Sequence, residues 1–321
     1  MPALRPLTFV PLLVAGLMFV APPARAIDCT IAESDTERAI CADPTVLAAD
    51  KAMSAAFSAV EASEPKPAQK VLADNQSAWI ESRDINCGTG DDGTKLSGAQ
   101  LSQCLLGETE ARQRFLSGQP EEGPGDPDQI IPTVVEGVDG TFIESFHFAA
   151  PKTPGEKLFN ALVAKELKLV HVAKNEDDYT DDFSMVLTYA SPQLISAHIE
   201  GTDLKPTLAH PMPYARQINV DLTSGKALTF ADAFAPEALP ELQQSCLPQV
   251  VAYTSPDGNS AIDQRVADVN LAVGDLNQWQ FGATKATVAF YAYADEIHAS
   301  CSFDYTKLRP MVKPGFPLPQ P

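Results

Sequence analysis

Six cysteines, spread unevenly along 321 residues, constrain most strongly how this chain can fold. Four lie in the first third and two in the last third: Cys29, Cys41, Cys87 and Cys104, then Cys246 and Cys301. In an oxidising compartment all six are expected to pair. The long gap between positions 104 and 246 suggests that each group closes within its own domain. Four cysteines allow three pairings, and the sequence does not choose among them.

The first 26 residues have the features of a secretory signal peptide. Arg5 precedes an apolar stretch, and Ala24-Arg25-Ala26 places small residues at the two positions that a signal peptidase reads. No later stretch approaches the roughly 18 apolar residues that a membrane-spanning helix needs. We therefore expect cleavage near Ala26 and a periplasmic or secreted protein that does not insert into a membrane.

The charge of the chain limits its partners. There are 42 acidic and 23 basic residues, a formal charge of -19. The leader carries Arg5 and Arg25 and no acid, so removing it leaves 21 basic against 42 acidic residues, a charge of -21. Nucleic acid and anionic membranes would repel such a protein. The charge favours a cationic partner or simply solubility, and it does not separate the two.

Composition predicts two unlike domains, 27–118 and 131–310. Residues 119–130 form an acidic linker rich in proline and glycine, without apolar periodicity, which is expected to be an extended, solvated tether. Residues 311–321 form a proline-rich tail that is expected to be ordered only where it docks.

The first domain is predicted to be helical. Asp43-Pro44 offers an N-cap and a proline at the first helical position, and apolar residues follow at helical spacing to Val60. Prolines at 65 and 67 break the chain before a second helix, and a third helix carries Leu101 to Leu116. Two antiparallel helices would bring Cys41 near Cys87.

The second domain alternates strands and helices. Strands are expected at 141–148, 183–190, 194–200, 214–222, 278–281 and 286–293. One helix is expected to begin at Pro154, and another to run from 230 to 253 with breaks at the prolines at 236, 240 and 248. The predicted fold class is α+β: a disulfide-bonded helical domain, then an antiparallel sheet with helices.

Motifs for catalysis are missing from the sequence. It contains no His-Glu-x-x-His, Gly-x-Ser-x-Gly or Cys-x-x-Cys. The acidic run from Glu176 to Asp182 has oxygen ligands for calcium but lacks the glycine spacing of a calcium loop, so a solvated turn is expected. We therefore predict no catalytic residue, no cofactor and no metal, and a protein that is not an enzyme. An envelope hydrolase or deacetylase needs a nucleophile or a set of metal ligands, and the sequence offers no motif for either.

A motif in the first domain resembles the LprI-type lysozyme inhibitor family. The pattern consists of Asp28-Cys29, Ala39-Ile40-Cys41, Leu47, Asp50, Gln76-Ser77-Ala78-Trp79, Arg83-Asp84, Cys87 and Cys104-Leu105. The chain departs from it after Cys104-Leu105, where an aromatic residue often follows. Trp79 and Arg83 lie one helical turn apart, so they are expected to pack and pair within the helical hairpin whichever function holds.

Residues 135–310 resemble the extracellular domain of RsiV, an anti-sigma factor that senses lysozyme. The similarity rests on His210, on Asn219 and Asp221 in a strand, and on Gly225 in the Ser-Gly-Lys turn that follows. The sequence shows no membrane helix and no sigma-binding segment, so signalling of the RsiV kind is not implied.

The two resemblances imply a binding protein that captures a cationic lysozyme-type muramidase and blocks its cleft. Acidic side chains would face the basic rim of the enzyme, and Asp91 and Asp92 are the candidate contacts. The alternative is a cell-envelope module that binds peptidoglycan or a protein partner without inhibiting lysozyme.

Overall fold

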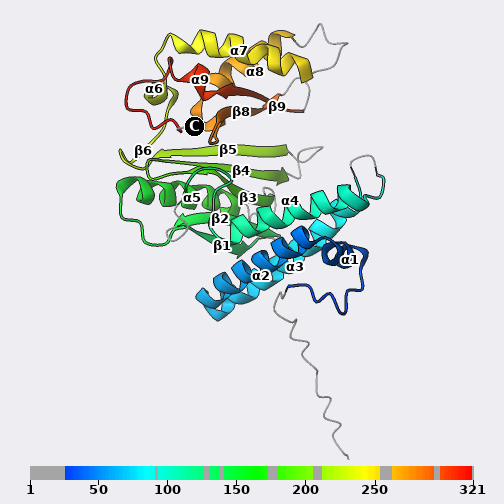
Figure 1. The fold of residues 1–321 in the computed structure, drawn as a ribbon. Helices are drawn as coiled ribbons and strands as arrows, with labels where there is room; N and C mark the ends of the chain where they lie inside the picture. The colour runs from blue at the N-terminus through cyan, green and yellow to red at the C-terminus, as the bar shows by residue number, and fades with distance from the viewer. Residues whose placement is uncertain are drawn as a thin grey trace, which may run out of the picture.

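The computed structural model describes residues 26–90, 93–125, 130–137, 141–172, 179–204, 212–253, 262–292 and 297–319. These residues form a helical N-terminal part, a six-stranded sheet and a three-stranded sheet with its own helices (Figure 1). The predicted α+β class is confirmed. None of the helices in these ranges is long and apolar enough to cross a membrane.

Four helices build the N-terminal part: α1 (Asp35–Ala42), α2 (Pro44–Ser63), α3 (Lys66–Gly88) and α4 (Gly98–Leu116). The expected start of α2 is confirmed, because the Asp43 carboxylate accepts from the backbone N–H groups of Thr45 and Val46. Helix α1 was not predicted. It begins at a capping box formed by Ser34 and Glu37.

Two disulfides fix the N-terminal helices. Cys29 pairs with Cys41 and Cys87 pairs with Cys104, at Cα–Cα distances of 5.6 and 5.5 Å. The first ties the segment before α1 to the end of that helix, and the second ties the end of α3 to α4. The structure thus selects one of the three pairings that the sequence left open.

The six-stranded sheet follows the order of the sequence: β1 (Ile130–Glu136), β2 (Phe142–Phe148), β3 (Tyr179–Ala190), β4 (Leu194–Leu204), β5 (Met212–Asp221) and β6 (Lys226–Ala227). Neighbours are antiparallel except β2 and β3, which are parallel and pair only at Ile143 and Phe183. Strand β1 was not predicted. It lies at the edge of the sheet, where Pro132 is tolerated although it lacks an N–H group.

One hydrophobic core runs from the helices into this sheet. It includes Met53, Phe57 and Phe115 from the helices and Phe146 from β2, and the rings of Phe115 and Phe146 meet edge to face at 5.2 Å. Helix α5 (Pro154–Val172) packs on the same sheet, where Phe159 joins this core. The two domains expected from composition therefore share a core.

The C-terminal layer contains the second sheet: β7 (Trp279–Phe281), β8 (Lys285–Ala292) and β9 (Ile297–Asp304). Figure 1 shows this sheet between the β4–β5 part of the larger sheet and helices α7 (Ala238–Tyr253) and α8 (Ile262–Gly274). Trp279 and Phe281 are fully buried in this layer. The predicted Cys246–Cys301 disulfide is confirmed, and it joins α7 to β9 at a Cα–Cα distance of 5.2 Å.

Three proline breaks were expected between residues 230 and 253, and only one is found. Pro236 separates α6 (Phe230–Ala233) from α7, but Pro240 lies in the first turn of α7 and Pro248 lies inside it. A proline in the first turn removes no helical hydrogen bond, which explains Pro240. Two short elements complete the layer: η1 (Leu276–Gln278) and α9 (Tyr305–Leu308).

Residues 121–124 are exposed, as expected for a solvated segment, but residues 121–125 are not a free tether. The N–H groups of Glu121, Glu122 and Gly125 donate to carbonyls of Leu187, Thr188 and Ala190 on β3. This side of β3 is open to them because β2 pairs with β3 only at Phe183. The proline-rich tail also docks: Val312 bridges to Phe234, and Leu318 is buried in the C-terminal core.

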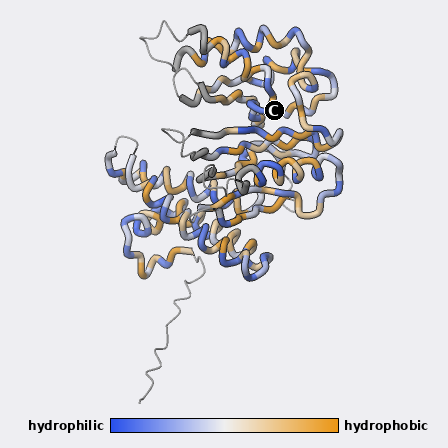
Figure 2. The backbone as a smooth tube through the Cα atoms, turned by 180° about the vertical axis from the view of Figure 1, so that it is seen from behind, coloured by the Kyte–Doolittle hydropathy of each residue, from blue (hydrophilic) through white to orange (hydrophobic). Residues whose placement is uncertain are grey.

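Hydrophobic residues concentrate along the strands in the middle of the molecule (Figure 2). Hydrophilic residues colour much of the outer helices and turns. The apolar strand residues belong to the two larger hydrophobic cores, one on each sheet.

Candidate functional site

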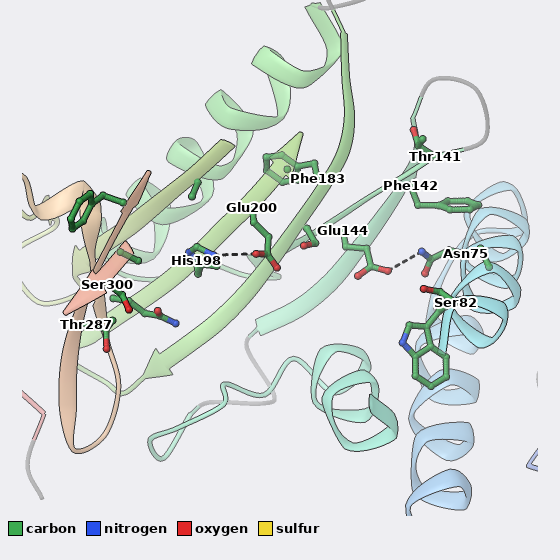
Figure 3. Close-up of a pocket in the computed structure, with 18 of the residues that line it drawn as sticks. Asn75, Ser82, Thr141, Phe142, Glu144, Phe183, His198, Glu200, Thr287 and Ser300 are labelled. Atoms are coloured by element: carbon green, nitrogen blue, oxygen red, sulfur yellow. Dashed lines mark hydrogen bonds and ion pairs between the residues drawn. The ribbon is translucent and has the colours of Figure 1, made fainter. Parts of the chain in front are cut away.

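A groove of about 1030 Å³ lies where α3, the six-stranded sheet and the three-stranded sheet meet (Figure 3). Helix α3 lines it with Asn75, Trp79 and Ser82. The larger sheet supplies Glu144, His198 and Glu200 among others, and the smaller sheet supplies Gln280, Thr287 and Ser300. All three layers of the fold therefore contribute polar side chains to one opening.

The helix wall is built around Arg112, which is 3% exposed. Its Nη1 group donates to Glu144 Oε1 at 2.7 Å and its Nε group to Gln76 Oε1 at 2.8 Å. Its Nη2 group donates to Asn75 Oδ1, and Asn75 Nδ2 donates to Glu144 Oε1 at 2.8 Å. Burial lowers the pKa of Arg112, while the carboxylate of Glu144 opposes that shift. The network fixes the Glu144 carboxylate at the groove wall.

Trp79 connects this network to the family motif. The guanidinium carbons of Arg83 and Arg112 lie 5.2 and 5.6 Å from the centroid of its ring, within the range of cation–π contact. Arg83 also donates to Asp84 Oδ1 through Nε at 3.0 Å and Nη2 at 2.8 Å. Trp79 and Arg83 thus pack and pair inside the helical hairpin, as expected from their spacing.

On the sheet wall, His198 lies between two partners. Its Nε2 atom is 3.5 Å from Glu200 Oε2, and Gln217 Nε2 lies within hydrogen-bonding distance of its Nδ1 atom. The amide of Gln217 thus holds the imidazole ring beside Glu200. The pair places a carboxylate and an imidazole at the groove.

The C-terminal motif residues lie in turns and packing contacts. Asn219 donates through Nδ2 to the carbonyls of Leu276 and Trp279 at 2.9 and 2.7 Å, which ties β5 to the three-stranded layer. Asp221 Oδ1 accepts from the backbone of Thr223 and Ser224 in the turn before β6. Gly225 closes that turn with a φ of +67°. His210 lies outside the described residues.

The candidate contacts Asp91 and Asp92 also lie outside the described residues, but the stem of their loop is described. Thr89 and Lys95 form an antiparallel bridge beside the Cys87–Cys104 disulfide. Lys95 Nζ lies 2.6 Å from Asp35 Oδ2, which ties the stem to α1. The structure does not place either aspartate relative to the groove.

Sequence reasoning missed the groove residues Glu144, His198 and Glu200, and their supporting residue Arg112. The one available signal was the presence of polar residues in otherwise apolar strands, because a buried polar group needs a partner. Within the described ranges, no group of three or more His, Cys, Asp or Glu residues could hold a metal ion. The arrangement offers acceptors, hydroxyls and amides, which suit binding.

Comparison with known proteins gives a family likeness for one part of the chain. Residues 29–116 match the family model described as "Lysozyme inhibitor LprI", a range that holds α1 to α4 and both N-terminal disulfides. No curated protein matches this chain.

Two solved structures resemble a larger part. A DUF3298 family member from Bacteroides fragilis NCTC 9343 is 11% identical, covers 58% of this chain and 93% of its own, and gives a TM-score of 0.38. A DUF3298 family protein from Pseudomonas aeruginosa PAO1 is 17% identical, covers 60% of this chain and 97% of its own, and gives a TM-score of 0.36. The predicted likeness of residues 135–310 to RsiV is not confirmed.

Proposed function

We propose that this protein is periplasmic or secreted and that it binds and inhibits a lysozyme-type muramidase. The match of residues 29–116 to a lysozyme inhibitor family carries the proposal. All four cysteines of that segment are paired within it, which suits an oxidising compartment. The motif residue Arg83 is buried, and its guanidinium lies over the ring of Trp79, which is partly buried at the groove.

Inhibition of this kind requires no chemistry from the protein. Occupation of the substrate cleft excludes the glycan strand, and the negative charge of the chain speeds encounter with a cationic enzyme. Asp91 and Asp92 are the proposed contacts. Their loop stem is held by a disulfide, a backbone bridge and the Lys95–Asp35 ion pair, which lowers the ordering entropy lost on binding.

A turbidity assay with a cationic lysozyme and a peptidoglycan suspension tests the proposal. We expect the purified chain to slow clearing in a stoichiometric manner, and added salt to weaken the effect. The double variant Asp91→Asn/Asp92→Asn is expected to inhibit about tenfold less well, since each lost charged contact weakens binding by roughly 0.5–1 kcal/mol. Glu237→Gln/Glu241→Gln, which removes one exposed charge just before α7 and one in its first turn, is the matched control and should inhibit normally. Undiminished clearing at excess protein would rule out inhibition.

The second candidate is a cell-envelope module that binds a peptidoglycan fragment or protein without inhibiting lysozyme. The observation that favours it is the groove, whose walls carry amide and hydroxyl groups as well as two carboxylates. Binding of soluble muropeptides, abolished by Glu200→Gln and accompanied by normal lysozyme activity, would select this function.

A further inference from the structure

The backbone nitrogen of Ile27 donates to the buried carboxylate of Asp50. The distance from Ile27 N to Asp50 Oδ2 is 2.9 Å, and Asp50 is 3% exposed. The other carboxylate oxygen, Oδ1, lies 4.0 Å from Nη1 of Arg83. Asp50 therefore lies between an arginine and the first residue after the expected cleavage point.

Among the described residues, the charges at ion-pair distance do not balance around Asp50 while Ile27 is part of an uncut chain, and Lys51 acts on Asp50 only from an exposed position. Arg83 contributes one positive charge to this cluster, and it is shared by the carboxylates of Asp50 and Asp84. Burial raises the pKa of Asp50, and the Ile27 N–H group, Arg83 and Lys51 only oppose that shift. A second cation beside Asp50 would bring the Arg83–Asp50–Asp84 cluster to neutrality.

We propose that cleavage between Ala26 and Ile27 supplies this cation, and that the new α-ammonium group of Ile27 forms an ion pair with Asp50. Water adds across the C–N bond, which breaks: its oxygen forms the carboxylate of Ala26, and both of its protons go to the Ile27 nitrogen, which becomes an ammonium group. The inference rests on the secretion part of the proposed function and is independent of lysozyme binding. The proposal thus assigns a cleavage site between Ala26 and Ile27, and it assigns Asp50 as the residue that binds the new N-terminus.

The fold holds Ile27 in place for this contact. The Cys29–Cys41 disulfide fixes the chain two residues later, and the Ile27 side chain packs against the cluster of Ile40, Val46, Cys87 and Leu105. One additional residue at the start would move the ammonium group about 3.8 Å along the chain, beyond direct contact with Asp50. The site therefore distinguishes a chain that begins at Ile27 from one that is a single residue longer.

Two versions of the full mature chain test the proposal, one beginning at Ile27 and one at Ala26. We expect the folding equilibrium constant, measured by urea unfolding at pH 7, to be about tenfold larger for the Ile27 chain, because charge-assisted hydrogen bonds are about twice as strong as neutral ones. Asp50→Asn should abolish the difference between the two chains. Asp35→Asn, an exposed aspartate on α1, should preserve it.

A spectroscopic readout separates this ion pair from a general effect of chain length. In the Ile27 chain the α-amino group should titrate above its ordinary range of about 7.7–8.0, and Asp50→Asn should return it to that range. Equal stability of the two chains, an unshifted α-amino group, or a secreted protein whose first residue is not Ile27 would each overturn the proposal. None of these measurements involves lysozyme, so the ion-pair proposal can be overturned without affecting the proposal of lysozyme inhibition, and the reverse also holds.

Discussion

Arg112 on α4 donates to Glu144 on β2 at 2.7 Å, and this bond crosses from the helices that match the inhibitor family to the sheet that follows them. The contact lies beside the Phe115–Phe146 ring pair, so polar and apolar interactions join the same two elements. Arg112 is almost wholly buried, and its hydrogen bonds and ring contacts among the described residues join α3, α4 and β2. The inhibitor-like helices are thus packed into the rest of the protein.

Removal of the Glu144 carboxylate is expected to destabilise the whole protein. Glu144→Leu leaves the Arg112 guanidinium buried without its charge partner, and such changes cost about 3–5 kcal/mol. Urea unfolding followed by circular dichroism gives the free energy. Asp74→Asn is the matched control, because its ion pair with Lys70 is exposed and should contribute less than about 1 kcal/mol. A loss at Glu144 no larger than the loss at Asp74 would contradict this account.

Loss of the Cys246–Cys301 disulfide is expected to destabilise the C-terminal layer by roughly 4 kcal/mol, since it closes a loop of 55 residues. The double variant Cys246→Ala/Cys301→Ala tests this by hydrogen exchange. Amides of α7 and β9 should exchange faster, and those of α2 and α4 should not, because the two regions belong to separate cores. Cys29→Ala/Cys41→Ala, with a separation of 12 residues, should show the opposite pattern. Faster exchange in both regions for either variant would contradict a local effect.

Local signals in the sequence predicted elements well. Asp43-Pro44 marked the start of α2, and the strands expected at 183–190 and 194–200 lie within β3 and β4. Helix α1 was missed although Ser34 and Glu37 carry a capping-box signal, and β1 was missed because Pro132 argues against a central strand. The second error arises because the position of β1 at the edge of the sheet decides whether a proline is permitted there.

The candidate site could not be predicted in the same way. Arg112 and Glu144 are 32 residues apart, and His198 and Gln217 meet through strand pairing at a separation of 19. The groove walls come from α3, β2, β4 and β8, which no local pattern brings together. The sequence did indicate the disulfide-bonded helices and their motif, because spacing within one segment carries that information.

Gly225→Ala is expected to destabilise the turn after β5 by about 1–3 kcal/mol. Gly225 has a φ of +67°, and an added Cβ would lie 2.6 Å from Pro154 Cβ at the start of α5. Gly315→Ala is the matched control. Gly315 also has a positive φ, of +88°, but nothing lies within 4 Å of an added Cβ. This substitution is therefore expected to cost only the backbone strain of about 1 kcal/mol. Thermal unfolding of both variants measures the difference. Equal losses would show that the approach of Pro154 has no energetic consequence.

His147 is expected to make the stability of the protein depend on pH below neutrality. Its Nδ1 atom lies 2.8 Å from Thr133 Oγ1, and burial lowers its pKa, although Glu64 opposes the shift. The unfolded chain, where histidine titrates near 6.5, then binds more protons than the folded chain as the pH falls through that value. Stability that is fully present above about pH 7 should therefore decline below about 6.5, and His147→Gln should remove that decline. Urea midpoints between about pH 5.5 and 8 measure it, with Glu64→Gln as the companion variant that should extend the decline to lower pH. Parallel curves for the parent protein and His147→Gln would show that another group causes the pH dependence.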